Sequence, residues 1–363
     1  MRKTNKHSSK RPVVCCLHPY LEERREEIEN GKYPLNHLWG IDAIETTPPW
    51  DTRVLSTFSL KIPSLLESLL NRSVFRGSPG AKVELTALKA SKQADLIYSV
   101  CGPLALSRLY PKKLVSWTFR NPTLQKNGLK FAHQAYKPRN LYANAGFLCL
   151  TPTAEKNFSK FAPSKFLPWC VDLEMFRPSK ETSLLPKPFF FASGKTQRDY
   201  ETLVKAAPMV DAEIRIIGPS HLRPSTIPSN INWINTSYDP PDKAIDYHNL
   251  RNWYNQAIAV CIPLSGDADD TCGYTNMLEG MAMAKPVLMT RSGCLHIEPE
   301  KGNFGYLINP RDPKDWSEKM NLILSNQEFT KALGENGRKI AEENFCRKTF
   351  NKNVISFLEN LLS

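Results

Sequence analysis

The sequence predicts an α/β chain that folds as two domains. Short apolar runs alternate with stretches of helical periodicity, which is the pattern of strands followed by helices. At 363 residues the chain is long for one domain and comfortable for two. The stretch 167–187 contains three prolines and few periodic residues, as is typical of a linker. We therefore expect one α/β domain on each side of it.

The domain boundaries follow from composition. Residues 1–11 are basic and polar and lack the apolar core of a signal peptide, so they are predicted to be a disordered tail. The first domain is expected over 12–168 and the linker over 169–187. The second domain is expected over 188–345. Residues 346–363 are expected to form a last helix, because apolar residues recur there at helical spacing.

Individual elements are predicted from the length and period of each apolar stretch. Buried strands are expected at 13–17, 95–100, 114–117, 147–150, 188–192, 213–217, 258–263 and 287–290. Helices are expected at 22–30, 63–70, 86–92, 198–207, 246–256, 275–284, 314–324, 328–343 and 351–362.

The charge and cysteine content narrow the class of protein. A net charge of +12 could reflect one of three partners: nucleic acid, an anionic membrane surface or phosphorylated small molecules. The alternative is an ordinary basic protein with no such partner. Because the basic residues are scattered, we expect no nucleic-acid partner. The nine cysteines show no paired spacing, which predicts free thiols in a reducing compartment and no zinc site. No run of 18 apolar residues occurs, so no transmembrane helix is expected. The cysteine usage favours a cytoplasmic location, and a peripheral one at an anionic membrane stays open.

The stretch 273–287 is the most informative part of the chain. It reads as a glycine turn, an amphipathic helix carrying one acid, and a buried strand. Unpartnered N–H groups at such a helix start attract phosphate. Glu279, one turn further, could accept hydrogen bonds from sugar hydroxyls. The alternative interpretation is a core helix with a capping glutamate.

Two cations follow a second glycine turn. Gly194 ends an apolar run, and Lys195 and Arg198 come directly after it. Backbone can approach a ligand closely at glycine, and cations placed there can neutralise phosphate charge. The alternative is a pair of solvated charges at a helix start.

Four segments together resemble the retaining GT-B glycosyltransferases of the "glycosyl transferases group 1" type, in that family's order and spacing. They are a linker with Val-Asp, a strand with its glycine loop and helix, the acidic helix, and the segment after it, at 170–178, 189–203, 278–287 and 302–312. The resemblance covers about 147–350. It implies two Rossmann-like domains facing a central cleft, with the last helix crossing back to the first domain. It also implies transfer of a sugar from a nucleoside diphosphate sugar with retained configuration.

The resemblance also assigns roles to residues. It implies that the donor is bound by Gly194, Lys195, Arg198, Gly273, Tyr274, Thr275 and Glu279. The cations, the Thr275 hydroxyl and the helix-start N–H groups would hold the diphosphate, and Glu279 the ribose. The family pairs this acid with another eight residues earlier, where this chain has Thr271. Asp269 and Asp270 could partly substitute, so the donor sugar stays open.

The family implies no protein nucleophile and no cofactor. A histidine or acid of the first domain often faces the reacting centre, and the candidates are His18, His37, Arg120 and His133. No metal is expected, since Asp267-Ala268-Asp269 is interpreted as a solvated loop. The acceptor stays open between a glycan, a lipid-linked molecule and a small molecule. Two alternatives remain: a catalytically inactive GT-B-like protein that binds a nucleotide sugar or glycan, and a GT-B epimerase or phosphorylase.

Overall fold

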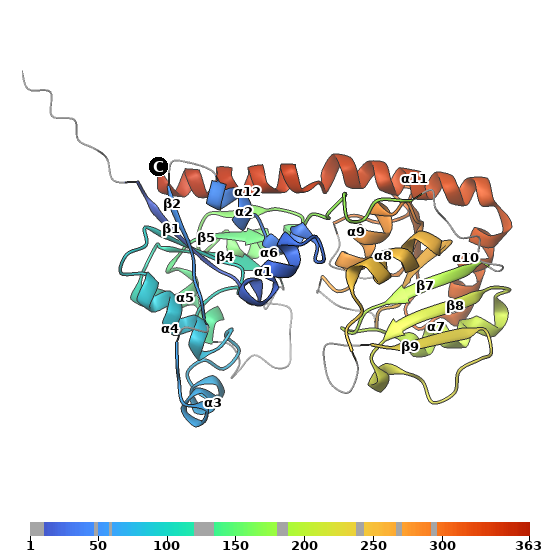
Figure 1. The fold of residues 1–363 in the computed structure, drawn as a ribbon, viewed down its shortest axis with the longest axis horizontal. Coiled ribbons are helices and arrows are strands. Elements are labelled where there is room, and N and C mark those ends of the chain that lie inside the picture. Colours follow the sequence, from blue (N-terminus) through green and yellow to red (C-terminus); the bar gives the residue numbers. More distant parts are fainter. Residues whose placement is uncertain are drawn as a thin grey trace, which may run out of the picture. The chain divides into compact units, whose positions relative to one another are not determined.

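The computed structural model describes residues 11–46, 50–57, 60–119, 134–179, 188–236, 243–265, 271–291 and 296–363. The chain divides into two compact units (Figure 1). The first comprises Met1–Glu23, Leu38–Leu167 and Asn351–Ser363, and the second comprises Arg24–His37 and Pro168–Phe350.

The first unit is built on a parallel six-stranded sheet in the order β2-β1-β3-β4-β5-β6. Its strands are β1 (Val13–Leu17), β2 (Asp51–Val54), β3 (Leu96–Ser99), β4 (Leu114–Thr118), β5 (Asn144–Cys149) and β6 (Ser164–Phe166). Its helices are α2 (Ile41–Thr46), α3 (Ser64–Arg72), α4 (Ala81–Ala90), α5 (Pro138–Leu141) and α6 (Pro152–Phe158). Helices α1 (Leu21–Glu29) and α12 (Arg347–Leu362) belong to it in part.

The second unit holds another parallel six-stranded sheet, in the order β12-β11-β10-β7-β8-β9. Its strands are β7 (Phe189–Ser193), β8 (Glu213–Gly218), β9 (Ile231–Asn235), β10 (Ala259–Ile262), β11 (Val287–Thr290) and β12 (Gly305–Ile308). Its helices are α7 (Tyr200–Ala206), α8 (Tyr247–Gln256), α9 (Tyr274–Ala282), α10 (Pro313–Ser325) and α11 (Gln327–Asn344). The two sheets confirm the predicted α/β class.

The central strands form because their residues are apolar on both faces. All five residues of β1 are buried, and so are all five of β7. Parallel strands covered by helices on both sides have this continuous apolar composition. Burying one phenylalanine side chain stabilises a fold by about 1.5–3 kcal/mol, and β7 buries Phe189, Phe190 and Phe191 completely.

Several elements were not predicted from the sequence. Strands β2 and β9 lie at the edges of their sheets and are partly exposed, so they lack a continuous apolar run. Strand β6 has three residues, and β12 has four. Helices α2, α5 and α6 are shorter than two turns or barely reach them, which is too short for a helical period to be recognised.

The segment Arg24–His37 packs with the second unit although it lies early in the chain. Its backbone is held by the linker, because Leu35 N–H donates to Asp172 Oδ2 at 2.8 Å. The other oxygen, Oδ1, accepts from the backbone N–H groups of Glu174 and Met175. The aspartate of the linker motif therefore joins two distant stretches of backbone.

All cysteines that the structure describes are free thiols, as predicted. Of the helices in the described ranges, none combines the length and the apolar character needed to cross a bilayer.

Candidate functional site

The candidate site lies in the second unit where its strand order reverses. From the centre the chain builds β7, β8 and β9 outward on one side, and β10, β11 and β12 on the other. Neighbouring strands β7 and β10 therefore lead their following loops in opposite directions and leave a crevice at their carboxyl ends. Ligands of open α/β sheets bind at such a point. Gly194 follows β7 directly at this edge.

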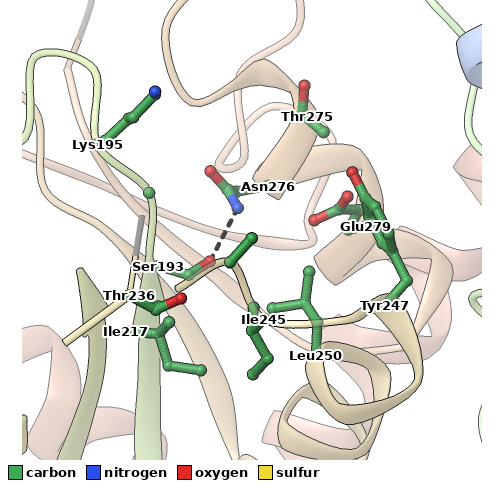
Figure 2. Close-up of a pocket in the computed structure, with 12 residues that line it drawn as sticks. Ser193, Lys195, Ile217, Thr236, Ile245, Tyr247, Leu250, Thr275, Asn276 and Glu279 are labelled. Atoms are coloured by element: carbon green, nitrogen blue, oxygen red, sulfur yellow. Dashed lines mark hydrogen bonds between the residues drawn. The ribbon is translucent and has the colours of Figure 1, made fainter. Parts of the chain in front are cut away.

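A cavity of about 210 Å³ opens at this edge. Its volume is several times the roughly 30 Å³ that one water molecule occupies in the liquid, so it can admit part of an organic ligand. It is lined by Ser193, Gly194, Lys195, Ile217, Thr236, Ala244, Ile245, Tyr247, Leu250, Thr275, Asn276 and Glu279. In the view of Figure 2, Lys195 and Thr275 lie at one end and the aliphatic Ile217, Ile245 and Leu250 at the other.

The loop after β7 requires glycine at position 194. Gly194 has φ +118°, and a Cβ built on it would lie 2.5 Å from Nη2 of Arg198. Any larger residue would be strained in its backbone and would displace the guanidinium. The glycine therefore lets Arg198 fold back beneath the loop.

The guanidinium of Arg198 forms hydrogen bonds with other residues of the protein. Its Nε donates to the carbonyl of Ser193 at 3.1 Å, and Nη1 donates to the carbonyl of Thr196 at 2.9 Å. Its Nη2 donates to Oδ1 of Asn276 at 2.5 Å. It is not among the residues that line the cavity. The structure thus gives Arg198 the role of joining the β7 loop to the start of α9.

A chain of hydrogen bonds continues from Arg198 to Glu279. Because Asn276 Oδ1 faces the guanidinium, its Nδ2 donates to Ser193 Oγ and to Tyr254 Oη, both at 3.0 Å (Figure 2 draws the first). Tyr254 Oη then donates to Glu279 Oε2 at 2.8 Å. Because Tyr254 Oη accepts a hydrogen bond from Asn276, it donates its own proton to Glu279. The carboxyl group of Glu279 is therefore held in one orientation beside the cavity.

Glu279 is 4% exposed, and its burial has a large electrostatic consequence. Removal from water raises the pKa of Glu279 to about 8, and the hydrogen bond from Tyr254 opposes this rise. The alternative in which Glu279 caps the helix is wrong. The carboxyl group accepts a hydrogen bond from Tyr254, and no side chain caps the start of α9. A buried acceptor at the wall of a cavity is suited to ligand hydroxyl groups.

The start of α9 depends on Gly273. This residue has φ +80°, and a Cβ on it would lie 2.6 Å from Ile262 Cγ2. The next residue, Tyr274, is buried, and its N–H donates to the carbonyl of Thr271 at 3.1 Å. Thr275 lines the cavity. Of the three residues predicted at this turn, Thr275 is therefore the one whose side chain reaches the cavity, and the other two shape the turn.

The structure brings most of the predicted donor residues together. Gly194, Lys195, Thr275 and Glu279 line one cavity, and Arg198 reaches it through Asn276. Sequence reasoning missed Ser193, Asn276, Tyr247, Tyr254 and the aliphatic wall. Asn276 lies within the stretch 273–287, and its polar side chain at the start of a predicted helix could have indicated a site residue. Tyr254 lies on α8, and no local pattern places it beside Glu279.

The catalytic candidates of the first half are only partly described. His18 follows β1 at the carboxyl edge of the first sheet, is buried, and its Nδ1 accepts from Tyr20 N–H at 3.3 Å. His37 belongs to the second unit, where its Nε2 lies 3.4 Å from the hydroxyl of Tyr247, a residue of the cavity wall. Arg120 and His133 lie outside the described residues.

Within the described ranges, no group of three or more histidine, cysteine, aspartate or glutamate side chains could hold a metal ion. Asp267, Asp269 and Asp270 lie outside those ranges.

Part of the second unit is similar to a known protein family. Residues 188–326 match the family described as Glycosyl transferases group 1. An uncharacterized glycosyltransferase of Methanocaldococcus jannaschii is 39% identical over 66 residues, which is 18% of this chain and 19% of that protein. The chain thus matches about a fifth of the length of such curated relatives.

Solved structures resemble nearly the whole chain. Sucrose-phosphate synthase from Thermosynechococcus elongatus has a TM-score of 0.65 at 14% identity, over 97% of this chain and 99% of that one. The Anabaena protein HepE in complex with UDP-glucose has a TM-score of 0.60 at 12% identity, over 96% and 99%. At such identities the likeness shows the fold alone. With the two parallel sheets, these findings show that the chain has the GT-B fold and that its residues 188–326 match the Glycosyl transferases group 1 family.

Proposed function

We propose that this protein transfers a glycosyl group from a nucleoside diphosphate sugar to an acceptor with retained configuration. The supporting observation is the order of groups along one cavity. Aliphatic side chains suit a base, the Glu279 carboxyl group suits ribose hydroxyls, and Lys195 with the start of α9 suits a diphosphate. The family match supports the same reaction class.

In the proposed reaction the bond between the anomeric carbon and the diphosphate oxygen breaks, and the acceptor oxygen bonds to that carbon on the same face. The leaving diphosphate takes the acceptor's proton. As negative charge grows on the leaving group, the Lys195 ammonium and the N–H groups at the start of α9 stabilise the transition state more than the ground state. The acceptor is a glycan, a lipid-linked molecule or a small molecule.

A second candidate is a GT-B protein that binds a nucleotide sugar without turning it over. The observation in its favour is Thr271, which stands where the family has the acid expected to contact the transferred sugar. A protein with an intact nucleotide site and an impaired sugar site would bind the donor and leave it whole.

A panel of nucleotide sugars tests both proposals. UDP-glucose is a reasonable first donor, since the Anabaena neighbour was solved with it. Donor hydrolysis or transfer to an added acceptor, with the anomeric configuration of the product read by NMR, supports the enzyme. Calorimetric binding with no turnover of any donor supports the binding protein. Absence of binding across the panel contradicts both.

Replacing Lys195 with alanine should weaken nucleoside diphosphate binding and leave the fold intact. Lys195 lines the cavity and is exposed, so its loss removes a charge from the ligand site without disturbing the core. A charge-assisted hydrogen bond contributes about 1.5–3 kcal/mol, which is roughly a tenfold to hundredfold loss of affinity. Isothermal calorimetry measures this, with Lys205→Ala on α7 as an exposed control. Equal affinity of both variants contradicts the role.

We also propose that no divalent ion is required, because Lys195 and the start of α9 can neutralise the diphosphate. Turnover should therefore be unchanged in excess chelator. Strict dependence on manganese or magnesium contradicts this proposal and directs attention to Asp267 and Asp269.

A further inference from the structure

Helix α3 of the first unit turns its apolar side to the solvent. Leu65 is 75% exposed, Leu66 48% and Leu69 57%. The polar side contacts the protein instead. Asn71 Oδ1 accepts from the N–H of Ala81 at the start of α4 at 2.7 Å. A surface helix of a globular protein normally packs its apolar stripe against the core, whereas Leu65, Leu66 and Leu69 of this helix face outward.

The helix lies at the rim of its unit. Figure 1 shows α4 between α3 and the sheet, in agreement with the contacts of α4 with both α3 and β1. No residue of α3 is buried. Of its leucines, Leu70 packs against the small core around Phe75. The other three therefore remain as an outward face.

Positive charges flank this outward face. Lys61 precedes the helix, Arg72 is its last residue and Arg76 follows it. All three are exposed, and so is Val74 between the two arginines. In the sequence, Glu67 is the one acid between residues 60 and 80, and it is paired with Lys82 of α4 at 3.3 Å. We call this surface the α3 patch; it consists of Lys61, Leu65, Leu66, Leu69, Arg72, Val74 and Arg76.

We propose that the α3 patch docks on an anionic membrane surface. A helix that lies in the bilayer interface has this composition, with aliphatic side chains entering the acyl boundary and cations meeting lipid headgroups. A second copy of the chain fits less well, because a twofold interface would place the same cations against one another. Four aliphatic side chains are also few for a stable interface, which buries about 800 Å² per partner. The inference does not depend on the proposed function.

Vesicle flotation tests this proposal. The wild-type protein should float with vesicles of equal parts phosphatidylcholine and phosphatidylserine at low salt, and not with phosphatidylcholine alone. Leu65→Ser/Leu69→Ser should lower partitioning more than tenfold, because both side chains lose burial in the acyl boundary. Arg72→Glu/Arg76→Glu should lower it at least tenfold and remove its salt dependence.

Matched controls separate the patch from general effects. Leu322→Ser removes an exposed leucine of α10, and Lys314→Glu/Lys331→Glu makes the same charge change at exposed sites of the second unit. Both should float like the wild type, and all variants should keep wild-type nucleotide affinity and melting temperature. Wild-type failure to float, or equal loss in patch and control variants, overturns the proposal. A concentration-dependent dimer abolished by Leu65→Ser/Leu69→Ser in sedimentation velocity would instead assign the patch to self-association.

Discussion

Replacing Glu279 with glutamine is expected to weaken binding of a ribonucleotide sugar about tenfold to a hundredfold, the effect of losing hydrogen bonds to a charged acceptor. Glutamine keeps the size of the side chain, so the cavity keeps its shape. Affinity is measured by calorimetry at about pH 9, where the carboxyl group of the wild type is mostly ionised. The matched ligand is the same donor with a 2′,3′-dideoxyribose, for which the wild type and the variant should bind alike, because the hydroxyls that reach Glu279 are gone.

The pH dependence of this affinity follows from the raised pKa of Glu279. With a pKa of about 8 in the ligand-free protein, the carboxyl group is mostly protonated at neutral pH. Ribose hydroxyls donate best to the ionised form, so donor affinity should rise as the pH goes from 7 through 8 and level off only above about pH 9. Both phosphates of a nucleotide sugar are diesters and do not titrate in this range. Glu279→Gln should abolish the rise. Equal pH profiles for the two proteins would contradict the ribose role.

The raised pKa of Glu279 also predicts how the free energy of unfolding depends on pH. Its folded-state pKa lies above the ordinary value of 4.5. The stability associated with the protonated form is therefore fully present below about pH 4.5 and is lost as the pH rises through about 8. Chemical unfolding of the ligand-free proteins should show the wild type losing free energy of unfolding over this window relative to Glu279→Gln. A variant that is less stable at every pH would indicate a purely structural carboxylate.

Replacing Arg198 with alanine is expected to lower both affinity and stability, in contrast to Lys195→Ala. The guanidinium donates to three acceptors on two elements, and its loss leaves the carbonyls of Ser193 and Thr196 and the Asn276 amide oxygen without these donors. Hydrogen bonds to charged groups contribute about 1.5–3 kcal/mol, so the free energy of unfolding should fall by a similar amount. Once Asn276 can turn, Tyr254 no longer has a single direction for its proton, and donor affinity should fall about tenfold or more.

Arg198→Lys distinguishes the geometry from the charge. Lysine keeps the positive charge but cannot present the planar set of donors that reaches three acceptors. It should therefore restore little of the stability measured by thermal unfolding. If lysine restores stability and affinity together, the charge alone matters, and Arg198 acts on the diphosphate directly.

The sequence by itself determined the fold class and the two turns of the site. Continuous apolar runs such as β7 predict buried parallel strands, because every residue of such a strand must be covered. Gly194 and Gly273 were recognisable as turns, and both have positive φ. The acidic helix carrying Glu279 was predicted as well. All of these features are encoded within a few neighbouring residues, since backbone preference and periodicity are local properties.

Only the tertiary structure decided how these pieces are used. Arg198 meets Asn276 across 78 residues of sequence, and Tyr254 meets Glu279 across 25. The sequence predicted a helix at 63–70, while its packing on α4 decides that the leucines of α3 face outward. Such contacts depend on which strands become neighbours, here β7 and β10, and on which side of a helix finds a partner. Periodicity reveals that a helix has two faces, but the free energy of the whole packed unit selects the face that is buried.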